Sequence, residues 1–345
     1  MKSLAAVVTV LFNPSEVHVQ NLFRLKQLCD AVVAVDNSPV ADLRLHKRIH
    51  AEGVEVLSNF NEGGVAGAYN KGLERLIEKG CRVLFIFDQD SEVQEDYFVQ
   101  MLDACRALDN SLFLMGPKVF DINVNRYLPA YVVHRFSARP IPITDQERGL
   151  LSCSLIITSG SVMSAETYRA LGPFMDDYFI DHVDTEYSFR AMCKGVRIYI
   201  NTSVVLKHEV GKRADHKFVF FKLIQWNASP LRLYYSARNS IHILRRYGSR
   251  FPLVILINMI TVQQFLSIAL YERNKRKKIV AMVAGIVDGL LGRLGSFENC
   301  RPRISIFCIR PDNERMSEIL RLIWPAKVFS GAWFKSKGTD PRGLR

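Results

Sequence analysis

Two aspartates follow a run of apolar residues in the segment VLFIFDQDSE (83–92). A carboxylate is costly to remove from water unless it is paired, hydrogen-bonded or bound to a cation. Asp88 and Asp90 occupy positions i and i+2 where a strand ends, so both can approach one divalent ion, and hard oxygen ligands suit Mg²⁺ or Mn²⁺. A solvated surface turn produces the same pattern more often. The pair alone is therefore a weak indication of a metal site.

A glycine-rich segment, NFNEGGVAGAYNKG (59–72), leads directly into a helical pattern. Backbone N–H groups at such a helix start can face an anion or a sugar ring. The segment lacks the G-K-[ST] of a phosphate-binding P-loop and the G-x-G-x-x-G of a dinucleotide fingerprint. A flexible loop followed by a helix start is the alternative reading.

Three acids lie close together in FIDHVDTEYSFR (179–190), namely Asp181, Asp184 and Glu186. Capping of a helix N-terminus accounts for one or two of them. One of the three could instead serve as a general base toward a hydroxyl group. His208, in VVLKHEVG, follows a short apolar strand and matters only if the fold brings it to Asp90.

The elements that must position these side chains alternate along the first hundred residues. Apolar runs with few polar interruptions predict strands, and helical spacing of apolar residues predicts helices between them. We expect strands at 5–13, 31–38, 54–60 and 82–90, and helices at 17–29 and 67–80. This alternation is typical of a parallel α/β sheet covered on both faces, where ligands bind beyond the carboxyl ends of the strands. Asn13, Asp36, the 59–64 loop and the two aspartates fall at that edge.

The later segments extend the sheet and then turn helical. Shorter strands are expected at 112–120, 154–164 and 197–211, with a helix at 184–195, and from about 230 the pattern is helical. The apolar stretch 251–270 is long enough to span a bilayer. Polar residues interrupt it, so a buried or interfacial helix is the preferred interpretation.

Composition and charge narrow the class of protein. The chain has 345 residues, 48% hydrophobic and 23% charged, with a net charge of +12, which is typical of a globular protein. The basic segment YERNKRKK (271–278) points to nucleic acid or an anionic membrane face. No zinc-finger or RNA-binding signature accompanies it, so we expect no nucleic-acid partner. Seven scattered cysteines indicate reduced thiols in a cytoplasmic protein.

Taken in order, these motifs resemble the family 2 inverting glycosyltransferases of GT-A fold. The similarity covers roughly residues 5–250 and is greatest to the rhamnosyltransferases that use dTDP-L-rhamnose to build rhamnolipid, lipopolysaccharide or O-antigen. It rests on VLFN, AVDNS, NEGGVAGAYNKG, DQDS, GSVMS, FIDHVDTEYSFR, LKHEVG and RLYYSARN. It implies a GT-A domain at 1–245 with a Rossmann-like, mostly parallel sheet, followed by a helical, apolar and basic region at 246–345.

The resemblance also implies a role for each matching residue. Asp36 matches the acid that contacts the nucleobase, Asn61 and Gly63 match the loop beside nucleotide and sugar, and Asp88 matches the first acid of the metal motif. Asp90 and His208 match the metal shell, and Arg238 the position of a basic group near the donor phosphates. Where the family usually has Glu-Asp, this chain has Val183-Asp184. Asp184 is then the expected base, with Asp181 and Glu186 as rivals.

The expected function is transfer of L-rhamnose from dTDP-L-rhamnose, with a divalent metal, to a hydroxyl of an amphipathic or lipid-linked glycan. The apolar and basic C-terminal region predicts a cytoplasmic protein held peripherally at the inner face of the inner membrane. A non-catalytic nucleotide-sugar or nucleic-acid binding module and a nucleotidyltransferase remain as alternatives.

Overall fold

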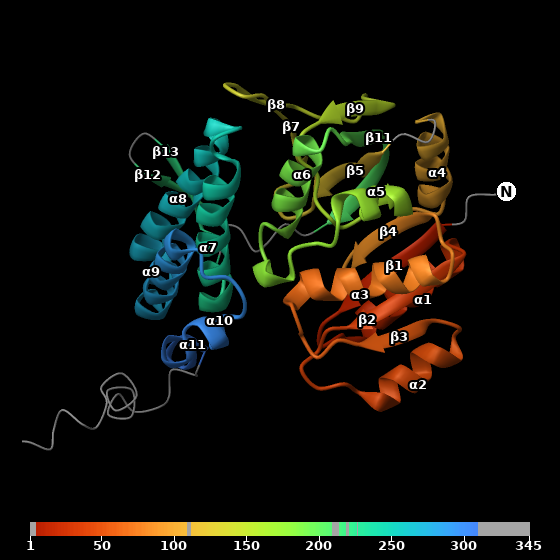
Figure 1. The fold of residues 1–345 in the computed structure, drawn as a ribbon, viewed down its shortest axis with the longest axis horizontal. Helices are drawn as coiled ribbons and strands as arrows, with labels where there is room; N and C mark the ends of the chain where they lie inside the picture. Colours follow the sequence, from red (N-terminus) through yellow and green to blue (C-terminus); the bar gives the residue numbers. More distant parts are fainter. Residues whose placement is uncertain (1–4, 109–111, 209–213, 219–220, 226, 310–345) are drawn as a thin grey trace, which may run out of the picture.

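A layered α/β body and a group of C-terminal helices make up the molecule (Figure 1). The computed structural model describes residues 5–108, 112–208, 214–218, 221–225 and 227–309. The predicted domain boundary after residue 245 remains a prediction, because helix α7 (Pro230–Tyr247) contacts both parts. Its Ile243 and Tyr247 belong to a core cluster of the α/β body. Its Tyr234 and Tyr235 pack with residues of α9 (Lys275–Leu291).

The central sheet contains nine strands within the described residues. Eight follow one another in the order β3 (Glu55–Ser58), β2 (Ala31–Asp36), β1 (Ala5–Leu11), β4 (Val83–Asp88), β10 (Ser161–Ser164), β5 (Phe113–Asp121), β11 (Arg197–His208) and β9 (Leu150–Cys153), and β6 (Arg126–Tyr127) pairs with β5. The strands from β3 to β4 pair in parallel, as do β5 and β11, whereas β10 and β9 run antiparallel to their neighbours. The sheet is therefore mostly parallel, as predicted.

Helices cover both faces of this sheet, which explains why β1 is buried along its whole length. Ala6, Val8 and Val10 pack toward α3 (Gly64–Glu78), α5 (Ala165–Leu171) and α6 (Val183–Cys193). The alternate residues of β1 pack toward α1 (Glu16–Leu28), α2 (Leu43–Ala51) and α4 (Tyr97–Ala107). Successive side chains of a strand point to opposite faces, so a strand buried on both is apolar throughout.

One expected strand is much shorter than predicted. The apolar run 154–164 forms only β10, because residues 154–160 cross beyond the sheet edge before the chain turns back at Gly160 (φ +76°). Ser159 in this crossing segment accepts a hydrogen bond from the backbone N–H of Asp88. The crossing segment thus belongs to the site edge and not to the sheet.

The remaining elements are short ribbons and C-terminal helices. Two hairpins are formed by β7 (Ala130–Val133) with β8 (Ala138–Ile141) and by β12 (Ala214–Phe218) with β13 (Phe221–Gln225), and the short helices are η1 (Asp176–Tyr178), η2 (Pro252–Val254), α10 (Phe297–Cys300) and α11 (Pro302–Ile309). The stretch expected as a helix at 251–270 is α8 (Ile255–Tyr271). Among the described residues, no helix combines the length and the apolar character needed to cross a bilayer.

Candidate active site

The turn after β4 directs its three polar side chains to different partners. Asp88 Oδ1 accepts a hydrogen bond from the Tyr69 hydroxyl at 2.7 Å. The Gln89 side chain instead pairs with the backbone of Phe12, accepting from its N–H at 2.9 Å and donating to its carbonyl oxygen at 3.2 Å. Gln89 therefore ties the turn to the end of β1 and leaves the two aspartates on the site side.

Asp88 is a half-buried carboxyl with other charged groups close by. Burial raises its pKa, the hydrogen bond from Tyr69 opposes that rise, and the negative charges of Asp90 and Asp184 add to it. Charges influence a pKa in this way only at short range. The acid of the strand end and the acid of the 179–190 motif, far apart in sequence, are therefore close in space.

Asp90 and His208 lie side by side because β11 ends beside the turn. A β-bridge between Glu92 and Lys207 holds the two segments together. Asp90 Oδ1 and His208 Nδ1 are 3.9 Å apart, and His208 Nδ1 is buried without a hydrogen-bond partner. A buried nitrogen without a partner, next to a carboxylate, suits a divalent cation whose remaining ligands come from a diphosphate. No group of three or more His, Cys, Asp or Glu side chains suited to a metal occurs in the described part of the chain.

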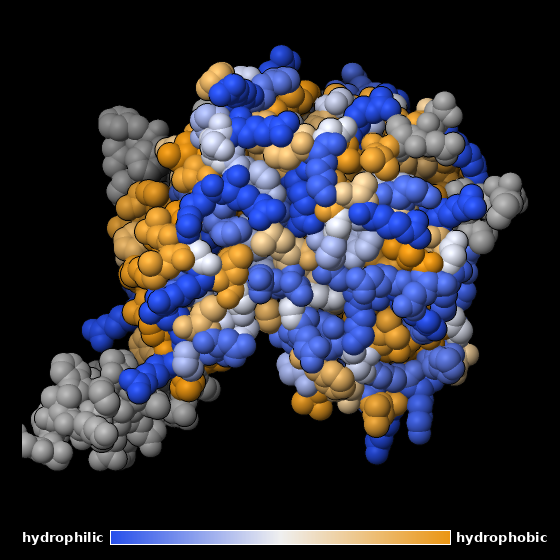
Figure 2. Space-filling view, viewed as in Figure 1, coloured by the Kyte–Doolittle hydropathy of each residue, from blue (hydrophilic) through white to orange (hydrophobic). Residues whose placement is uncertain are grey.

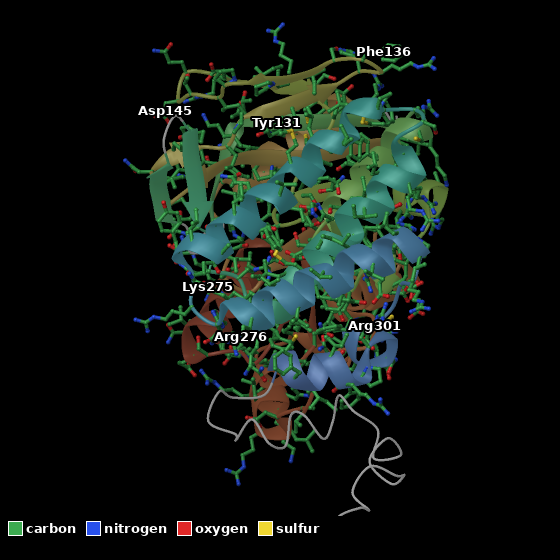
Figure 3. The ribbon with its side chains drawn as sticks, turned by 90° about the vertical axis from the view of Figure 1, so that its left-hand side faces the viewer. Tyr131, Phe136, Asp145, Lys275, Arg276 and Arg301 are labelled. Carbon is green, nitrogen blue, oxygen red and sulfur yellow. The ribbon has the colours of Figure 1, made fainter. Side chains whose placement is uncertain are left out.

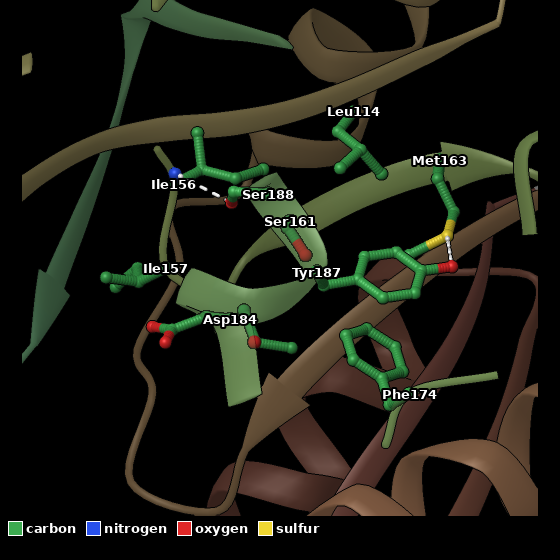
Figure 4. Close-up of a pocket in the computed structure, with 10 residues that line it drawn as sticks. Leu114, Ile156, Ile157, Ser161, Met163, Phe174, Asp184, Tyr187 and Ser188 are labelled. Carbon is green, nitrogen blue, oxygen red and sulfur yellow. Dashed lines mark hydrogen bonds between the residues drawn. The ribbon is translucent and has the colours of Figure 1, made fainter. Parts of the chain in front are cut away.

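Asp184 lies in the first turn of α6, where its Oδ1 accepts from the Thr185 backbone N–H at 2.7 Å and from the Thr185 hydroxyl at 3.2 Å. Burial raises the pKa of Asp184, and the neighbouring His182 opposes the rise. Asp184 lines a pocket together with Ile157, Tyr187 and seven other residues (Figure 4). A half-buried carboxyl with a raised pKa beside a pocket is suited to accept a proton.

The two other acids considered as the base, Asp181 and Glu186, are bonded to arginine side chains. Asp181 forms a two-point ion pair with Arg232. Glu186 is fully buried, pairs with Arg190 and accepts a hydrogen bond from the Tyr247 hydroxyl at 2.6 Å. Asp184 is thus the acid of the motif that has no cationic side chain bonded to it among the described residues.

The loop predicted to contact the donor is built from a chain of side-chain amides. Asn59 donates to Asn37 at 2.8 Å, and Asn37 donates to Asn61 at 3.1 Å. Asn61 and Gly63 both adopt positive φ, of +61° and +63°, and Gly63 is the N-cap of α3. The helix starts at Gly64, three residues before the predicted start. The loop also packs against the acceptor-side motif, since the Val65 N–H donates to the Phe179 carbonyl oxygen at 2.8 Å.

Asp36 lies at the end of β2 with its carboxylate already bonded. Its Oδ1 accepts from the Ser38 N–H at 3.0 Å, and its Oδ2 lies 2.6 Å from His46 Nε2. Asp36 is 2% exposed, so a partner from α2 holds the carboxylate in place. Its predicted contact with a nucleobase stays a prediction.

Arg238 is placed differently from what a phosphate contact requires. Its side chain is fully buried, and its guanidinium donates to Asn239 Oδ1 and to the carbonyl oxygens of Gly295, Asp177 and Tyr178. These bonds consume most of its donors. Arg238 joins α7 to the loop before α6, and this bonding favours a structural role over the predicted phosphate contact.

Three further residues belong to the site although the sequence alone gave them no role. The pKa of the buried Tyr69 hydroxyl is raised by burial and then by the charges of Asp88, Asp184 and Asp90. Tyr69 is therefore hydrogen-bonded to one of the three acids and near the other two. His46 holds Asp36, and Arg232 holds Asp181. Tyr69 stood inside the recognised glycine-rich motif, but no spacing rule connects His46 or Arg232 to its partner.

Two sequence comparisons indicate the class of enzyme. Residues 8–172 match the family model described as glycosyl transferase family 2. The dTDP-rhamnosyl transferase RfbF of Shigella flexneri is 27% identical over 303 residues, which cover 86% of this chain and 98% of that protein.

Solved structures agree on the fold. GalNAc-T7, crystallised with UDP, GalNAc and Mn²⁺, matches with a TM-score of 0.53 and 14% identity over 88% of this chain, which spans 57% of that structure's length. Residues 1–349 of S. aureus TarS match with a TM-score of 0.50 and 10% identity, over 88% of this chain and 86% of that one. The predicted GT-A fold is confirmed. Residues 8–172 match the glycosyl transferase family 2 model, and together with the similarity to RfbF this identifies the chain as a glycosyltransferase.

Proposed function

We propose that this glycosyltransferase moves L-rhamnose from dTDP-L-rhamnose, with inversion, to a hydroxyl of an amphipathic or lipid-linked glycan. The donor is supported by the similarity to RfbF, which extends over nearly the whole of that protein. The observation that carries the reaction type is the convergence of Asp88, Asp90 and Asp184 on Tyr69. This convergence supports a base and a metal site close to one another at one edge of the sheet.

Asp184 is the proposed base. Its raised pKa makes the carboxylate a stronger proton acceptor than a solvated aspartate. The two bonds from Thr185 hold Oδ1, which fixes the direction in which the other oxygen can face an acceptor hydroxyl. As the acceptor oxygen attacks the anomeric carbon, its proton passes to Asp184, and the bond to the dTDP oxygen breaks on the opposite face.

Asp90 and His208 are the proposed ligands of Mg²⁺ or Mn²⁺, and the donor diphosphate supplies further oxygens. When bound, the metal neutralises the charge that develops on the departing diphosphate. Asp88 is held by the hydrogen bond from Tyr69, and its negative charge adds to the attraction for the cation. Asp36, Asn61 and Gly63 remain the proposed contacts of nucleobase and sugar.

A donor screen tests this proposal. The purified chain is incubated with Mn²⁺ and a panel of dTDP-, UDP- and GDP-sugars, and the release of nucleotide is followed. We expect dTDP-L-rhamnose to be turned over fastest, and NMR of the product with a rhamnolipid or lipid-linked glycan acceptor to show an inverted anomeric centre. Faster turnover of a UDP-sugar, or retention of configuration, would overturn the proposal.

An anionic membrane is the proposed site of the acceptor. The outer sides of α8 and α9 expose large apolar residues, and the apolar surface at the left of Figure 2 lies over these helices. The exposed ones are Ile255, Leu256, Met259, Ile260, Val262, Phe265, Leu266, Leu270, Val280, Val283, Val287, Leu290 and Leu291. In the side view, Lys275 and Arg276 lie where α8 passes to α9 (Figure 3). Apolar burial with basic attraction is what peripheral binding to anionic lipid requires.

The basic segment contributes less charge than its sequence indicates. Lys278 is buried and paired with Glu272 at 2.6 Å, and Lys275 donates to the last carbonyl oxygens of α8. We therefore expect the apolar face to carry most of the affinity. Met259 on α8 and Val99 on α4 are comparably exposed, at 63% and 61%, so Val99 serves as the control position for Met259.

Vesicle flotation separates these contributions. Met259→Glu should stop the protein floating with phosphatidylglycerol vesicles at low salt, whereas Val99→Glu should float as the unchanged protein does. Loss of flotation in both variants, or no flotation of the unchanged protein, would overturn the membrane proposal.

A further inference from the structure

Arg232 stands in the first turn of α7, directly facing the acceptor-side motif. Its backbone N–H is capped by the Ser229 hydroxyl at 3.3 Å. Its guanidinium makes two contacts with Asp181, Nη2 to Oδ1 at 2.5 Å and Nε to Oδ2 at 3.3 Å. Asp181 precedes the proposed base Asp184 by three residues. The charge of Asp181 also contributes to the raised pKa of Asp184, so the ion pair lies near that acid.

Arg232 and Arg238 lie on the same helix but differ in what they can do. The Arg238 side chain is fully buried and bonded to backbone carbonyl oxygens. The Arg232 side chain is 53% exposed and that of Asp181 is 18% exposed, so the bond between them is open to competition. Exposed ion pairs contribute little stability and exchange readily. Of these two arginines, Arg232 is thus the one whose guanidinium can change partner.

Arg232 also lies near the proposed donor loop. Its partner Asp181 follows Phe179 by two residues, and the Phe179 carbonyl oxygen accepts a hydrogen bond from the Val65 N–H in the first turn of α3, directly after that loop. The negative charge of Asp88 also contributes to the raised pKa of Arg232, which agrees with a position near the diphosphate site proposed at Asp90. Guanidinium groups bind phosphate oxygens in the same two-point manner as they bind carboxylates.

We propose that Arg232 is the donor-diphosphate clamp, held by Asp181 in the free enzyme and transferred to the phosphate oxygens when the nucleotide binds. The inference rests on the proposed function, since it requires a nucleoside diphosphate at Asp90. It assigns to Arg232 the phosphate contact expected of Arg238. Asp181 acts as a competitor that keeps the arginine oriented until the donor arrives.

Binding of dTDP in the presence of Mn²⁺, measured by calorimetry, tests the clamp. Arg232→Gln should weaken dTDP binding by about 10- to 100-fold, the loss expected for a charge-assisted contact. Asp181→Asn should leave binding unchanged or tighten it by about two- to five-fold, because the competitor for the guanidinium is gone. The double variant should bind as weakly as Arg232→Gln alone. Arg106→Gln is the control, since Arg106 is paired with Asp103 on α4.

The outcomes separate the inference from the function on which it rests. If the unchanged protein binds dTDP but Arg232→Gln binds it equally well, the clamp is overturned and the donor assignment stands. If the unchanged protein prefers another nucleotide, the donor is overturned, and the same titration with that nucleotide decides the clamp. A purely structural ion pair predicts that Asp181→Asn weakens dTDP binding relative to the unchanged protein. This result also contradicts the clamp, and it needs no measurement on Arg232→Gln, so it holds even if that variant fails to fold.

Discussion

Gly64 is the point at which the donor loop touches the acceptor-side motif, and its replacement by alanine tests whether that contact positions the base. Gly64 has a φ of +61°, and a Cβ added there would lie 2.2 Å from the carbonyl oxygen of Phe179. The hydrogen bond from Val65 to that same oxygen would have to lengthen as the segments part. Asp184 follows Phe179 by five residues and would move with it.

Two costs add up in Gly64→Ala. The left-handed backbone costs an alanine about 1–2 kcal/mol, and the forced contact costs a further 1–3 kcal/mol or so, as overpacking does. Gly195→Ala is the matched control, because Gly195 has a φ of +72° with no atom within 4 Å of an added Cβ. Gly195→Ala should therefore lose only the stability that the left-handed backbone costs. The two variants should therefore differ in the free energy of unfolding by about 1–3 kcal/mol.

Thermal unfolding and steady-state kinetics provide the readouts. The Tm of Gly64→Ala should lie several degrees below that of Gly195→Ala, at roughly 2–4 °C per kcal/mol. Its kcat should fall by about 100-fold, since a displacement near 1 Å of a reacting group has that effect. Gly195→Ala should keep nearly full activity. Equal Tm and kcat in the two variants would refute the role of the loop contact.

Three further perturbations test the surroundings of the acids. Because burial raises the pKa of Asp184, kcat should rise with pH through that raised pKa. The neutral Asp184 carboxyl contributes to the stability of the fold, and this contribution is complete below the ordinary aspartate pKa of about 4 and is lost as the pH rises through the raised pKa. A pH series in which kcat falls, or in which this contribution to Tm grows, as the pH rises through the raised pKa would contradict this. Tyr69→Phe should destabilise the fold by about 1.5–3 kcal/mol in urea unfolding, because Asp88 loses its donor. His46→Ala should raise the donor KM and lower the unfolding free energy by about 1–3 kcal/mol, because the buried Asp36 loses a partner; an unchanged KM would separate Asp36 from the donor.

The sheet and the edge that carries the acids could be predicted because their signals are local. An apolar run buried on both faces, as in β1 and β4, has no polar positions to place in water, and the polar residues that follow must lie at the strand end. The parallel order then brings such ends together. The placement of Asp36, Asp88 and Asp90 at the strand ends could therefore be predicted from the sequence, whereas their roles remain proposals.

Residues whose place depends on packing between distant segments could not be predicted in this way. The run 154–160 is as apolar as a strand, yet it crosses the site edge because Ser159 binds the backbone of Asp88. Arg238 and Arg232 are six positions apart on one helix, and only the loop packed on α7 decides which is buried. Lys278 was counted as surface charge until the structure paired it with Glu272. Each case depends on a contact between segments that no periodicity encodes.

The central claim, that Asp184 is the base facing a metal-bound donor, is tested most directly by Asp184→Asn assayed for turnover and for dTDP binding with Mn²⁺. We expect turnover to fall by about 10²- to 10⁴-fold, as for the loss of a general base. Binding of dTDP should stay close to that of the unchanged protein, and Asp181→Asn should remain active. Full turnover in Asp184→Asn, or a loss of dTDP binding as large as its loss of turnover, would contradict the account.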